Sequence, residues 1–263
     1  MLLMVSPYRD IAPGYDCTIG LPFFLQVRDS FEKLAQRYGI RFCSAADLGC
    51  GTGLFARYLN LCWNVPVYAI DNCSAMLWQA RRNCGRANVC FLQQDIRCLS
   101  LPSPVDLITA NFDTLNHLRS AGELRLTIGR IAANLCPGGH FYFDIITPCQ
   151  PAGGYDVLIP NRCVKRSWLH QRIHWDPRAR LLETFALQHR RGGCAPAMAR
   201  VIERAYDVGE VGACLHEVGF TVRGVHDFET LRVPSGCPPR IIVVAQKAPR
   251  GSKSAIAKEE ELQ

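Results

Sequence analysis

The stretch Phe42-Cys-Ser-Ala-Ala-Asp-Leu-Gly-Cys-Gly-Thr-Gly-Leu-Phe55 decides the expected fold. An apolar segment ends in the carboxylate of Asp47, and glycines follow in alternation at Gly49, Gly51 and Gly53. Glycine adopts backbone dihedrals that are closed to residues with a Cβ, and it lets a ligand approach the main chain. The free N–H groups at the start of a following helix favour an anionic group. The stretch therefore predicts a strand, a ligand-binding loop and a helix.

Apolar periodicity on both sides of this stretch predicts that strands alternate with helices. The expected strands are 43–48, 65–70, 89–92, 105–110 and 140–146, and the expected helices are 21–38, 53–61, 74–83 and 121–135. This alternation predicts an α/β fold with a mostly parallel sheet and helices on both faces. Ligands of such sheets lie beyond the carboxyl ends of the strands. Asp47, Asp71, Asn111 and Asp144 should therefore lie along that edge.

Residues 148–207 interrupt the alternation and predict an inserted antiparallel β subdomain that covers the site. Its expected strands are 163–168, 172–175, 181–189 and 199–206, after a loop rich in proline and glycine. The other predicted parts are an N-terminal segment and helix (1–42), a binding core (43–147), the C-terminal part of the core (208–248, with a helix over 208–218 and strands at 220–228 and 240–246), and a polar, disordered tail (249–263).

The composition is that of a globular protein, with 48% hydrophobic and 20% charged residues among 263. No apolar run is long enough to span a membrane, and the first five residues are too short for a signal-peptide core. The 14 cysteines form no C-x-x-C pair or zinc-ligand cluster, so we expect reduced thiols in a cytoplasmic protein. The net charge of +7 is dispersed, and nucleic acid is therefore not indicated as a partner.

The spacing of the glycine loop distinguishes two kinds of ligand. Dinucleotide-binding folds use G-x-G-x-x-G, whereas residues 47–53 read Asp-Leu-Gly-Cys-Gly-Thr-Gly. This pattern resembles the first motif of the class I methyltransferases that use S-adenosylmethionine (SAM). The resemblance covers residues 15–246 and implies a doubly wound, seven-stranded, Rossmann-like sheet. Residues 111–118, 203–206 and 218–220 resemble uncharacterised bacterial methyltransferase-domain proteins and small-molecule N-methyltransferases of the amino-sugar and glycine type.

The resemblance implies a role for each part of the SAM site. The glycine loop, with Cys50, would take the methionine end and Asp47 its ammonium group, while Asp71 would accept both ribose hydroxyls. Asp95 and Ile96, in Gln94-Asp95-Ile96, resemble an adenine clamp. The remaining residues expected at the cofactor are Tyr15, Asn72, Met76, Asn111 and Phe112. Met76 could equally be a core residue, and Cys50 a small packing residue.

His117 is the candidate general base or acceptor-orienting group, because an imidazole titrates near neutrality. A helix-capping or core histidine is an equally good interpretation. Tyr15, in a Tyr-Asp pair, would fold over the cofactor or substrate, or simply pack the N-terminal segment. The candidate substrate residues are Tyr8, Asp144, Trp168, Trp175 and Tyr206, although aromatic residues in a small sheet are more often packing residues.

The resemblance implies methyl transfer to a nitrogen or oxygen of a small-molecule acceptor, with nitrogen slightly preferred and S-adenosylhomocysteine as product. A sulfonium is already a good leaving group, so a positioned lone pair in line with the S–CH₃ bond suffices and no metal is expected. Asn111-Phe112 lacks the two prolines of base N-methyltransferases. The alternatives are an RNA or protein methyltransferase and a SAM-binding regulatory protein without turnover. A monomer or a homodimer is expected.

Overall fold

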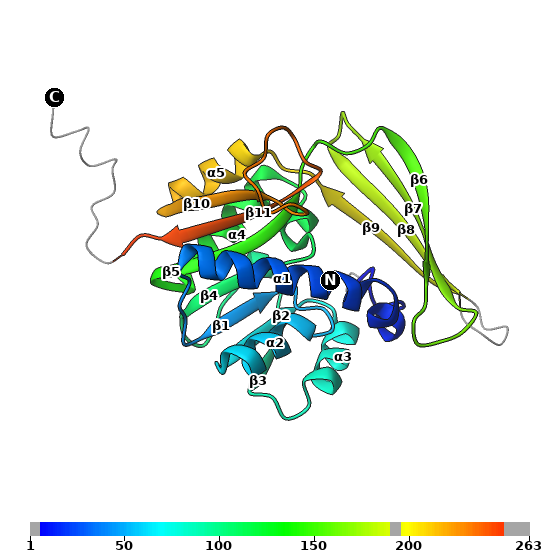
Figure 1. The fold of residues 1–263 in the computed structure, drawn as a ribbon, viewed down its shortest axis with the longest axis horizontal. Coiled ribbons are helices and arrows are strands. Elements are labelled where there is room, and N and C mark those ends of the chain that lie inside the picture. Colours follow the sequence, from blue (N-terminus) through cyan, green and yellow to red (C-terminus); the bar gives the residue numbers. More distant parts are fainter. Residues whose placement is uncertain (1–5, 190–195, 250–263) are drawn as a thin grey trace.

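The computed structural model describes residues 6–189 and 196–249. Within these residues the main sheet has seven strands in the order β10-β11-β5-β4-β1-β2-β3 (Figure 1). The parallel strands are β1 (Ala45–Leu48), β2 (Val67–Asp71), β3 (Val89–Gln93), β4 (Val105–Ala110) and β5 (Leu135–Ile146). β11 (Arg240–Lys247) runs antiparallel to its neighbours β5 and β10 (Phe220–Asp227). The predicted doubly wound, mostly parallel sheet is confirmed.

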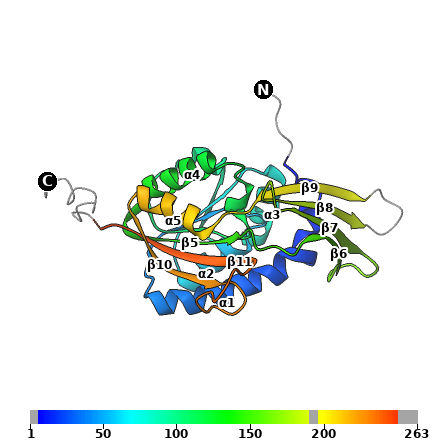
Figure 2. The ribbon, with the colours of Figure 1, turned by 90° about the horizontal axis from the view of Figure 1, so that it is seen from above.

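Helices cover both faces of this sheet (Figure 2). One face packs against α1 (Leu21–Tyr38), α2 (Leu54–Trp63) and α3 (Ser74–Cys84), and the other against α4 (Ala121–Ala133) and α5 (Val208–Glu217). Side chains alternate across a strand, so Leu107 joins the α1–α2 core while its neighbour Ile108 joins the α4–α5 core. Short helical turns are η1 (Ala12–Gly14), η2 (Asp16–Gly20), η3 (Ile96–Cys98) and η4 (Thr114–His117).

The inserted residues form a second, antiparallel sheet beyond the carboxyl ends of the parallel strands, on the right of Figure 1. Its strands, in spatial order, are β6 (Gly153–Pro160), β7 (Trp168–Asp176), β8 (Leu181–His189) and β9 (Ala197–Arg204). The predicted insertion is confirmed, but its first strand was misplaced at 163–168. β6 forms instead where glycine and proline suggested a loop, because an edge strand tolerates Pro160 at its last position.

Asn116 fastens the insertion to the core. Its side chain is fully buried, and its Nδ2 donates to the carbonyl oxygens of Ile146 and Arg204 at 3.0 and 2.7 Å. Its Oδ1 accepts from the main-chain N–H of Ile146 at 3.0 Å. One side chain thereby joins the ends of β5 and β9, which fixes the insertion relative to the carboxyl edge of the main sheet.

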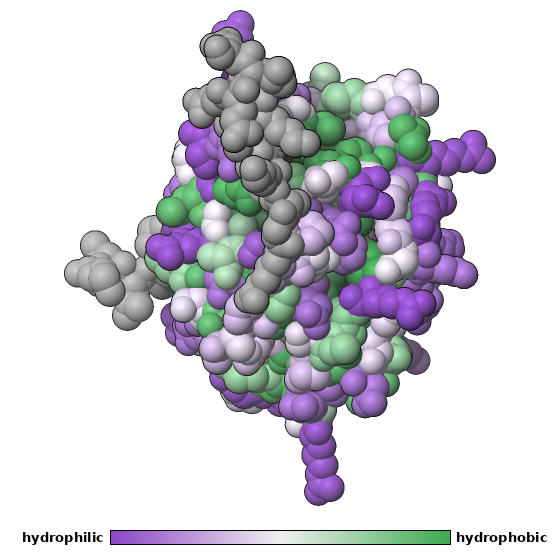
Figure 3. Space-filling model, turned by 90° about the vertical axis from the view of Figure 1, so that its left-hand side faces the viewer, coloured by the Kyte–Doolittle hydropathy of each residue, from purple (hydrophilic) through white to green (hydrophobic). Residues whose placement is uncertain are grey.

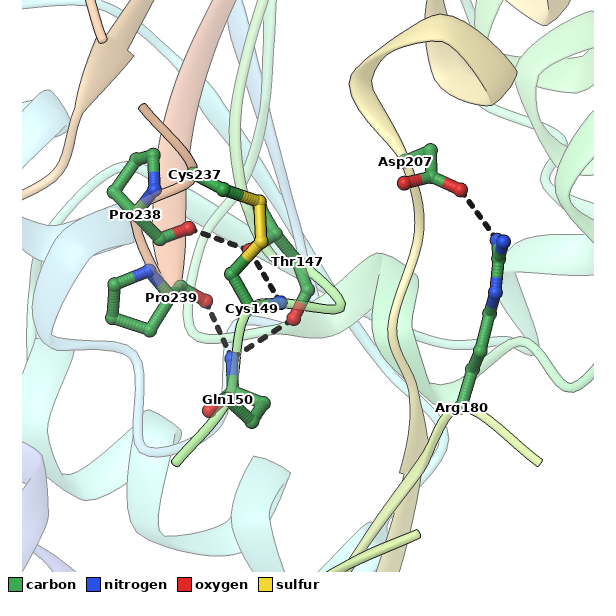
Figure 4. The surroundings of a disulfide bond; sticks show 8 residues. All are labelled: Thr147, Cys149, Gln150, Arg180, Asp207, Cys237, Pro238 and Pro239. Carbon is green, nitrogen blue, oxygen red and sulfur yellow. Dashed lines mark hydrogen bonds and ion pairs between the residues drawn. A yellow bond between two sulfur atoms is a disulfide. The ribbon is translucent and has the colours of Figure 1, made fainter. Parts of the chain in front are cut away.

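Two disulfide bonds occur in the described part of the chain, Cys17–Cys163 and Cys149–Cys237, with Cα–Cα distances of 5.6 and 5.7 Å. The expectation that all cysteines are reduced thiols is therefore wrong for these four. The partners are 146 and 88 residues apart in sequence, so spacing did not reveal them. Around the second bond, Gln150 and Thr147 donate to the carbonyl oxygens of Pro239 and Pro238 (Figure 4).

The exposed face opposite the insertion carries hydrophilic and apolar residues interspersed, where the view is not covered by grey atoms (Figure 3). No described helix is long and apolar enough to cross a membrane. The predicted disordered tail lies, after Pro249, outside the described residues.

We predict that peptide mapping of the non-reduced protein will find both disulfides. Each closes a long loop, so reduction should lower the free energy of unfolding by about 2–4 kcal/mol per bond, measured by chemical denaturation. Cys149→Ser should reproduce the loss for one bond, whereas Cys43→Ser, at an exposed free cysteine, should not. Recovery of all four cysteines as free thiols would contradict the pairing.

Candidate active site

Three adjoining cavities lie at the carboxyl edge of the main sheet in the described part of the chain. A small loop cavity of about 50 Å³ borders the glycine loop. A central cavity of about 610 Å³ lies beyond β2 and β4, and an outer cavity of about 730 Å³ lies between the core and the face of the inserted sheet that carries Ile173, Leu182 and Val201. Four residues line both the central and the outer cavity, and we call their position the junction: Tyr8, Tyr15, Phe112 and Val201.

The three glycines of the loop have different tasks. Gly49 and Gly51 line the loop and central cavities. Gly51 has a φ of +53°, and an added Cβ would meet no atom within 4 Å, so its main chain is open to a ligand. Gly53 does not line these cavities. A Cβ there would lie 2.9 Å from the Cβ of Ala80, so Gly53 instead allows α2 to pack closely on α3.

The loop cavity contains a buried carboxyl group and a buried amide. Asp47 is 2% exposed and accepts from the hydroxyl of Thr109 at 2.8 Å, and burial raises its pKa to about 7. Asn111 is 4% exposed, and neither its Nδ2 nor its Oδ1 has a hydrogen-bond partner among the described residues. A buried amide left unpaired costs free energy, so Asn111 is poised to bind a polar ligand.

Asp71 connects the loop to the end of β2. Its Oδ2 accepts from the main-chain N–H of Gly51 at 2.9 Å, and its Oδ1 accepts from that of Cys73 at 2.8 Å. Burial raises the pKa of Asp71, and these two hydrogen bonds oppose the shift. Asp71 lines the central cavity, which Asn72 and Met76 also line.

Asp95 and Ile96 line the central cavity from the start of η3. The guanidinium of Arg97 donates to both carboxylate oxygens of Asp95 and also to Glu123 at 2.7 Å. The hydrogen bonds from Arg97 lower the pKa of Asp95, which keeps it ionised. The sequence did not indicate a role for Arg97, because its contact with Glu123 depends on the packing of η3 against α4.

Segment 6–20 covers the junction. The rings of Tyr8 and Tyr15 pack edge to face with centroids 6.2 Å apart. Asp16 anchors the segment to the core, because it accepts from the hydroxyl of Thr52 at 2.5 Å and from the amide of Asn83 at 2.8 Å. Cys17 ties it to the insertion. Tyr15 lines all three cavities and also packs against Tyr8 within the segment, so its position fits both interpretations of this residue.

His117 lies at the end of η4 on the wall of the central cavity. Its Nε2 is 3.2 Å from the hydroxyl of Tyr8 and 3.8 Å from Oε1 of Glu203. Burial lowers the pKa of His117, so the imidazole is neutral at physiological pH. A neutral imidazole at this position is able to accept a proton or a hydrogen bond.

Asp144 does not line these cavities, and its carboxylate is hydrogen-bonded and ion-paired within the protein. It is 1% exposed, accepts from the main-chain N–H of Phe112 at 2.7 Å, and forms an ion pair with Arg240. Arg240 also pairs with Asp113, and its guanidinium lies 4.8 Å from the ring centroid of Phe23. Burial raises the pKa of Asp144 to about 7, and Arg240 opposes this shift. Asp144 thereby positions Phe112 rather than a ligand.

The other predicted substrate aromatics lie away from the cavities, except Tyr8. Trp168 is 40% exposed and stacks on His189. Trp175 packs in an apolar cluster with Leu182, and the buried Tyr206 donates to the carbonyl oxygen of Leu118 at 2.7 Å. Their placement follows the bland interpretation of aromatic residues in a small sheet as packing residues.

Glu203 is a cavity residue that the sequence reasoning did not propose. Ala197, Ala199, Val201 and Glu203 alternate as the inward positions of β9, and Glu203 is 7% exposed at the wall of the outer cavity. An acid in the inward phase of a strand was a usable signal, but the phase of β9 was not known. The described residues hold no cluster of three His, Cys, Asp or Glu side chains that could bind a metal ion.

We predict that Arg240→Met destabilises the protein by about 3–5 kcal/mol at pH 8, because it leaves Asp113 and Asp144 buried without a counter-charge. A carboxyl group whose pKa is raised by folding contributes stability at low pH that is lost as pH rises through that pKa. The loss should therefore be smaller at pH 5.5, in chemical denaturation at both values. Arg223→Met, at an exposed arginine, is the control, and an equal loss at both pH values would contradict the prediction.

Comparison with known proteins agrees with this geometry. Residues 45–139 match the family model described as a methyltransferase domain. A curated relative from Streptomyces fradiae, dTDP-3-amino-3,6-dideoxy-alpha-D-glucopyranose N,N-dimethyltransferase, is 29% identical over 106 residues, which are 40% of each chain. A relative from Geobacillus sp. (strain WCH70) is 27% identical over 52% of this chain and 57% of its own. The matches thus span about half the length of these curated relatives.

The fold is similar to that of solved structures over nearly the whole chain. A S-adenosylmethionine-dependent methyltransferase from Clostridium acetobutylicum superposes with a TM-score of 0.75 and 22% identity, covering 92% of this chain and 99% of that one. The likeness includes the inserted sheet, since the match extends far beyond residues 45–139. This chain therefore contains a methyltransferase domain at residues 45–139 and has the class I methyltransferase fold, as the resemblance of its glycine loop predicted.

Proposed function

We propose that this protein transfers a methyl group from SAM to a nitrogen or oxygen of a small-molecule acceptor. The observation that carries the proposal is the junction, where a cavity on the glycine loop meets a second cavity under the insertion. Donor and acceptor sites that share one wall are what a direct transfer between two bound molecules requires.

The residues of the loop and central cavities fit the groups of SAM. Asp47 has the charge to bind an ammonium group, and the unpaired amide of Asn111 can accept from that ammonium and donate to a carboxylate. The open main chain at Gly51 leaves room for the methionine end. The carboxylate of Asp71 lines the central cavity and suits the ribose hydroxyls, and Asp95 lines the same cavity, where it would read the adenine edge.

SAM supplies an activated methyl group on a sulfonium. The chain itself has to place the acceptor in line and exclude water, and Tyr8, Tyr15 and Phe112 enclose the junction for this purpose. The neutral His117 beside the junction is the candidate to orient the acceptor or take its proton. Nitrogen is the preferred acceptor atom, which is supported by the amino-sugar N,N-dimethyltransferase among the relatives.

The volume of the outer cavity, about 730 Å³, suits a small acceptor rather than RNA or protein. A monomer or homodimer stays a prediction. The cytoplasmic location was inferred from reduced cysteines, and the two disulfides remove that support, because glutathione and thioredoxin keep cytosolic thiols reduced.

Binding of S-adenosylhomocysteine, measured by calorimetry, tests the cofactor site. Asp71→Asn should weaken binding by about 2–4 kcal/mol, because charge-assisted hydrogen bonds to the ribose are lost. Asp156→Asn, at an exposed acid on β6, is the matched control. Unchanged affinity in Asp71→Asn would remove the ribose assignment, and no binding to the wild type would remove the proposed function.

Turnover is tested by S-adenosylhomocysteine production from SAM against a panel of metabolites. His117→Ala should lower turnover and leave the affinity for S-adenosylhomocysteine largely unchanged, because His117 lies beside the junction, in contact with Tyr8, and is not one of the groups assigned to the cofactor. Binding without turnover on any acceptor would instead favour the alternative of a regulatory SAM-binding protein.

Asp47 should make cofactor binding depend on pH. Because the pKa of Asp47 is raised to about 7, its carboxyl group is mostly protonated below that pH when no ligand is bound. An ammonium ligand favours the ionised carboxylate. The affinity for S-adenosylhomocysteine should therefore rise from pH 6 to pH 8, by up to about tenfold per unit below the pKa. Calorimetry in two buffers of different ionisation heat should show proton release at pH 6. Asp47→Asn should abolish the release, and release that persists in this variant would contradict the assignment.

A further inference from the structure

Glu203 is a buried acid that no hydrogen bond within the described residues satisfies. It is more than nine-tenths buried, faces inward from β9 and lines the outer cavity close to the junction. Among the described residues it makes an ion-pair contact with Nε2 of His117, at 3.8 Å from Oε1. Burying a carboxylate without a partner is costly, so such a group is usually paired with a ligand or has a function.

The charges around Glu203 do not supply that partner. The guanidinium of Arg240 is held by Asp113 and Asp144, which contribute two carboxylates to one cation. The phenols of Tyr8 and Tyr15 stay protonated, because burial raises their pKa. Arg119, the other cation near Glu203, is on the exposed surface.

The described residues that line the outer cavity also carry more acids than bases. The bases are Lys33 and Arg240, and the acids are Asp29, Asp113, Glu203, Asp227 and Glu229. This excess of negative charge attracts cations and repels carboxylates and phosphates. Because Arg240 is already paired, a cationic group on the ligand is the complement that this cavity lacks.

The hydrogen bonds at the junction separate the tasks of Glu203 and His117. In the tautomer in which the hydroxyl of Tyr8 donates to Nε2 of His117, the lone pair of that nitrogen is occupied. The carboxylate of Glu203 then keeps open lone pairs toward the outer cavity. His117 lines the central cavity and orients the acceptor from that side, while Glu203 lines the outer cavity, where the acceptor binds.

We propose that Glu203 binds the ammonium group of the acceptor at the junction and takes one of its protons, so that the site selects amines over alcohols and acids. This inference rests on the proposed methyl transfer. The proton passes from the ammonium nitrogen to the carboxylate, which leaves a neutral amine and a carboxylic acid. The freed nitrogen lone pair then forms the N–C bond while the S–C bond breaks, and its electron pair stays on sulfur.

Desolvation favours this proton transfer. Burial raises the pKa of Glu203, and the carboxylates of Asp113 and Asp144 add to the shift while Arg240 opposes it. Burial lowers the pKa of an ammonium group, so the two groups exchange a proton more readily in the cavity than in water. Transfer leaves no charge on either partner, which removes the cost of a buried ion pair.

Binding of matched probes to the protein saturated with S-adenosylhomocysteine tests the proposal. The pairs are cyclohexylamine with cyclohexanol and benzylamine with benzyl alcohol, which differ only in the group that would meet Glu203. In calorimetry at pH 7.5, the wild type should bind each amine about tenfold or more tightly than its alcohol. Glu203→Gln should lose this preference and keep its affinity for S-adenosylhomocysteine.

Glu183→Gln is the matched control, because it removes an acid from the opposite face of the inserted sheet, where Glu183 pairs with Arg200, and it should keep the amine preference. Glu203→Asp, which retains the charge, should keep part of the preference and shows whether charge or shape decides it. A wild type without amine preference, or a Glu203→Gln variant that retains it, overturns the inference. Failure of S-adenosylhomocysteine to bind the wild type overturns the proposed function instead, so the two failures are distinguishable.

Discussion

The hydrogen bond from the main chain of Gly51 to the carboxylate of Asp71 is the interaction on which the site depends. It holds a glycine at positive φ against the end of the neighbouring strand, so that the loop stays open and no side chain fills it. The same carboxylate accepts from Cys73 and thereby fixes the start of α3. A single acid thus sets the loop, the following helix and the edge of the central cavity together.

On the acceptor side, one arginine likewise holds several groups together, and these groups come from distant parts of the chain. Arg240 on β11 neutralises Asp113 after β4 and Asp144 on β5, and it packs against the ring of Phe23 on α1. Because this arginine is fully engaged, Glu203 is left without a counter-charge. The structure therefore separates a closed, structural ion cluster from an open acid that faces the cavity.

Enclosure of the junction depends on connections between the core, the insertion and segment 6–20. Asn116 joins the ends of β5 and β9, and Asp16 anchors the segment beside the glycine loop. The disulfide Cys17–Cys163 links segment 6–20 to the insertion. The disulfide Cys149–Cys237 links the start of the insertion to the loop before β11. These connections hold the core, the insertion and segment 6–20 together around the junction.

The sequence alone determined the parallel sheet, its helices, the glycine loop and the positions of Asp47, Asp71, Asp95 and Asn111, because periodicity and strand ends are local properties of the chain. It also located the insertion, although β6 was misplaced, since edge strands tolerate the glycine and proline that usually signal a loop. The tertiary structure alone decided that Asp144 is bound within the protein, that four cysteines are paired, and that Glu203 faces a cavity. These features depend on which strands become neighbours and on which face each strand turns inward, and neither is encoded within a short stretch of residues.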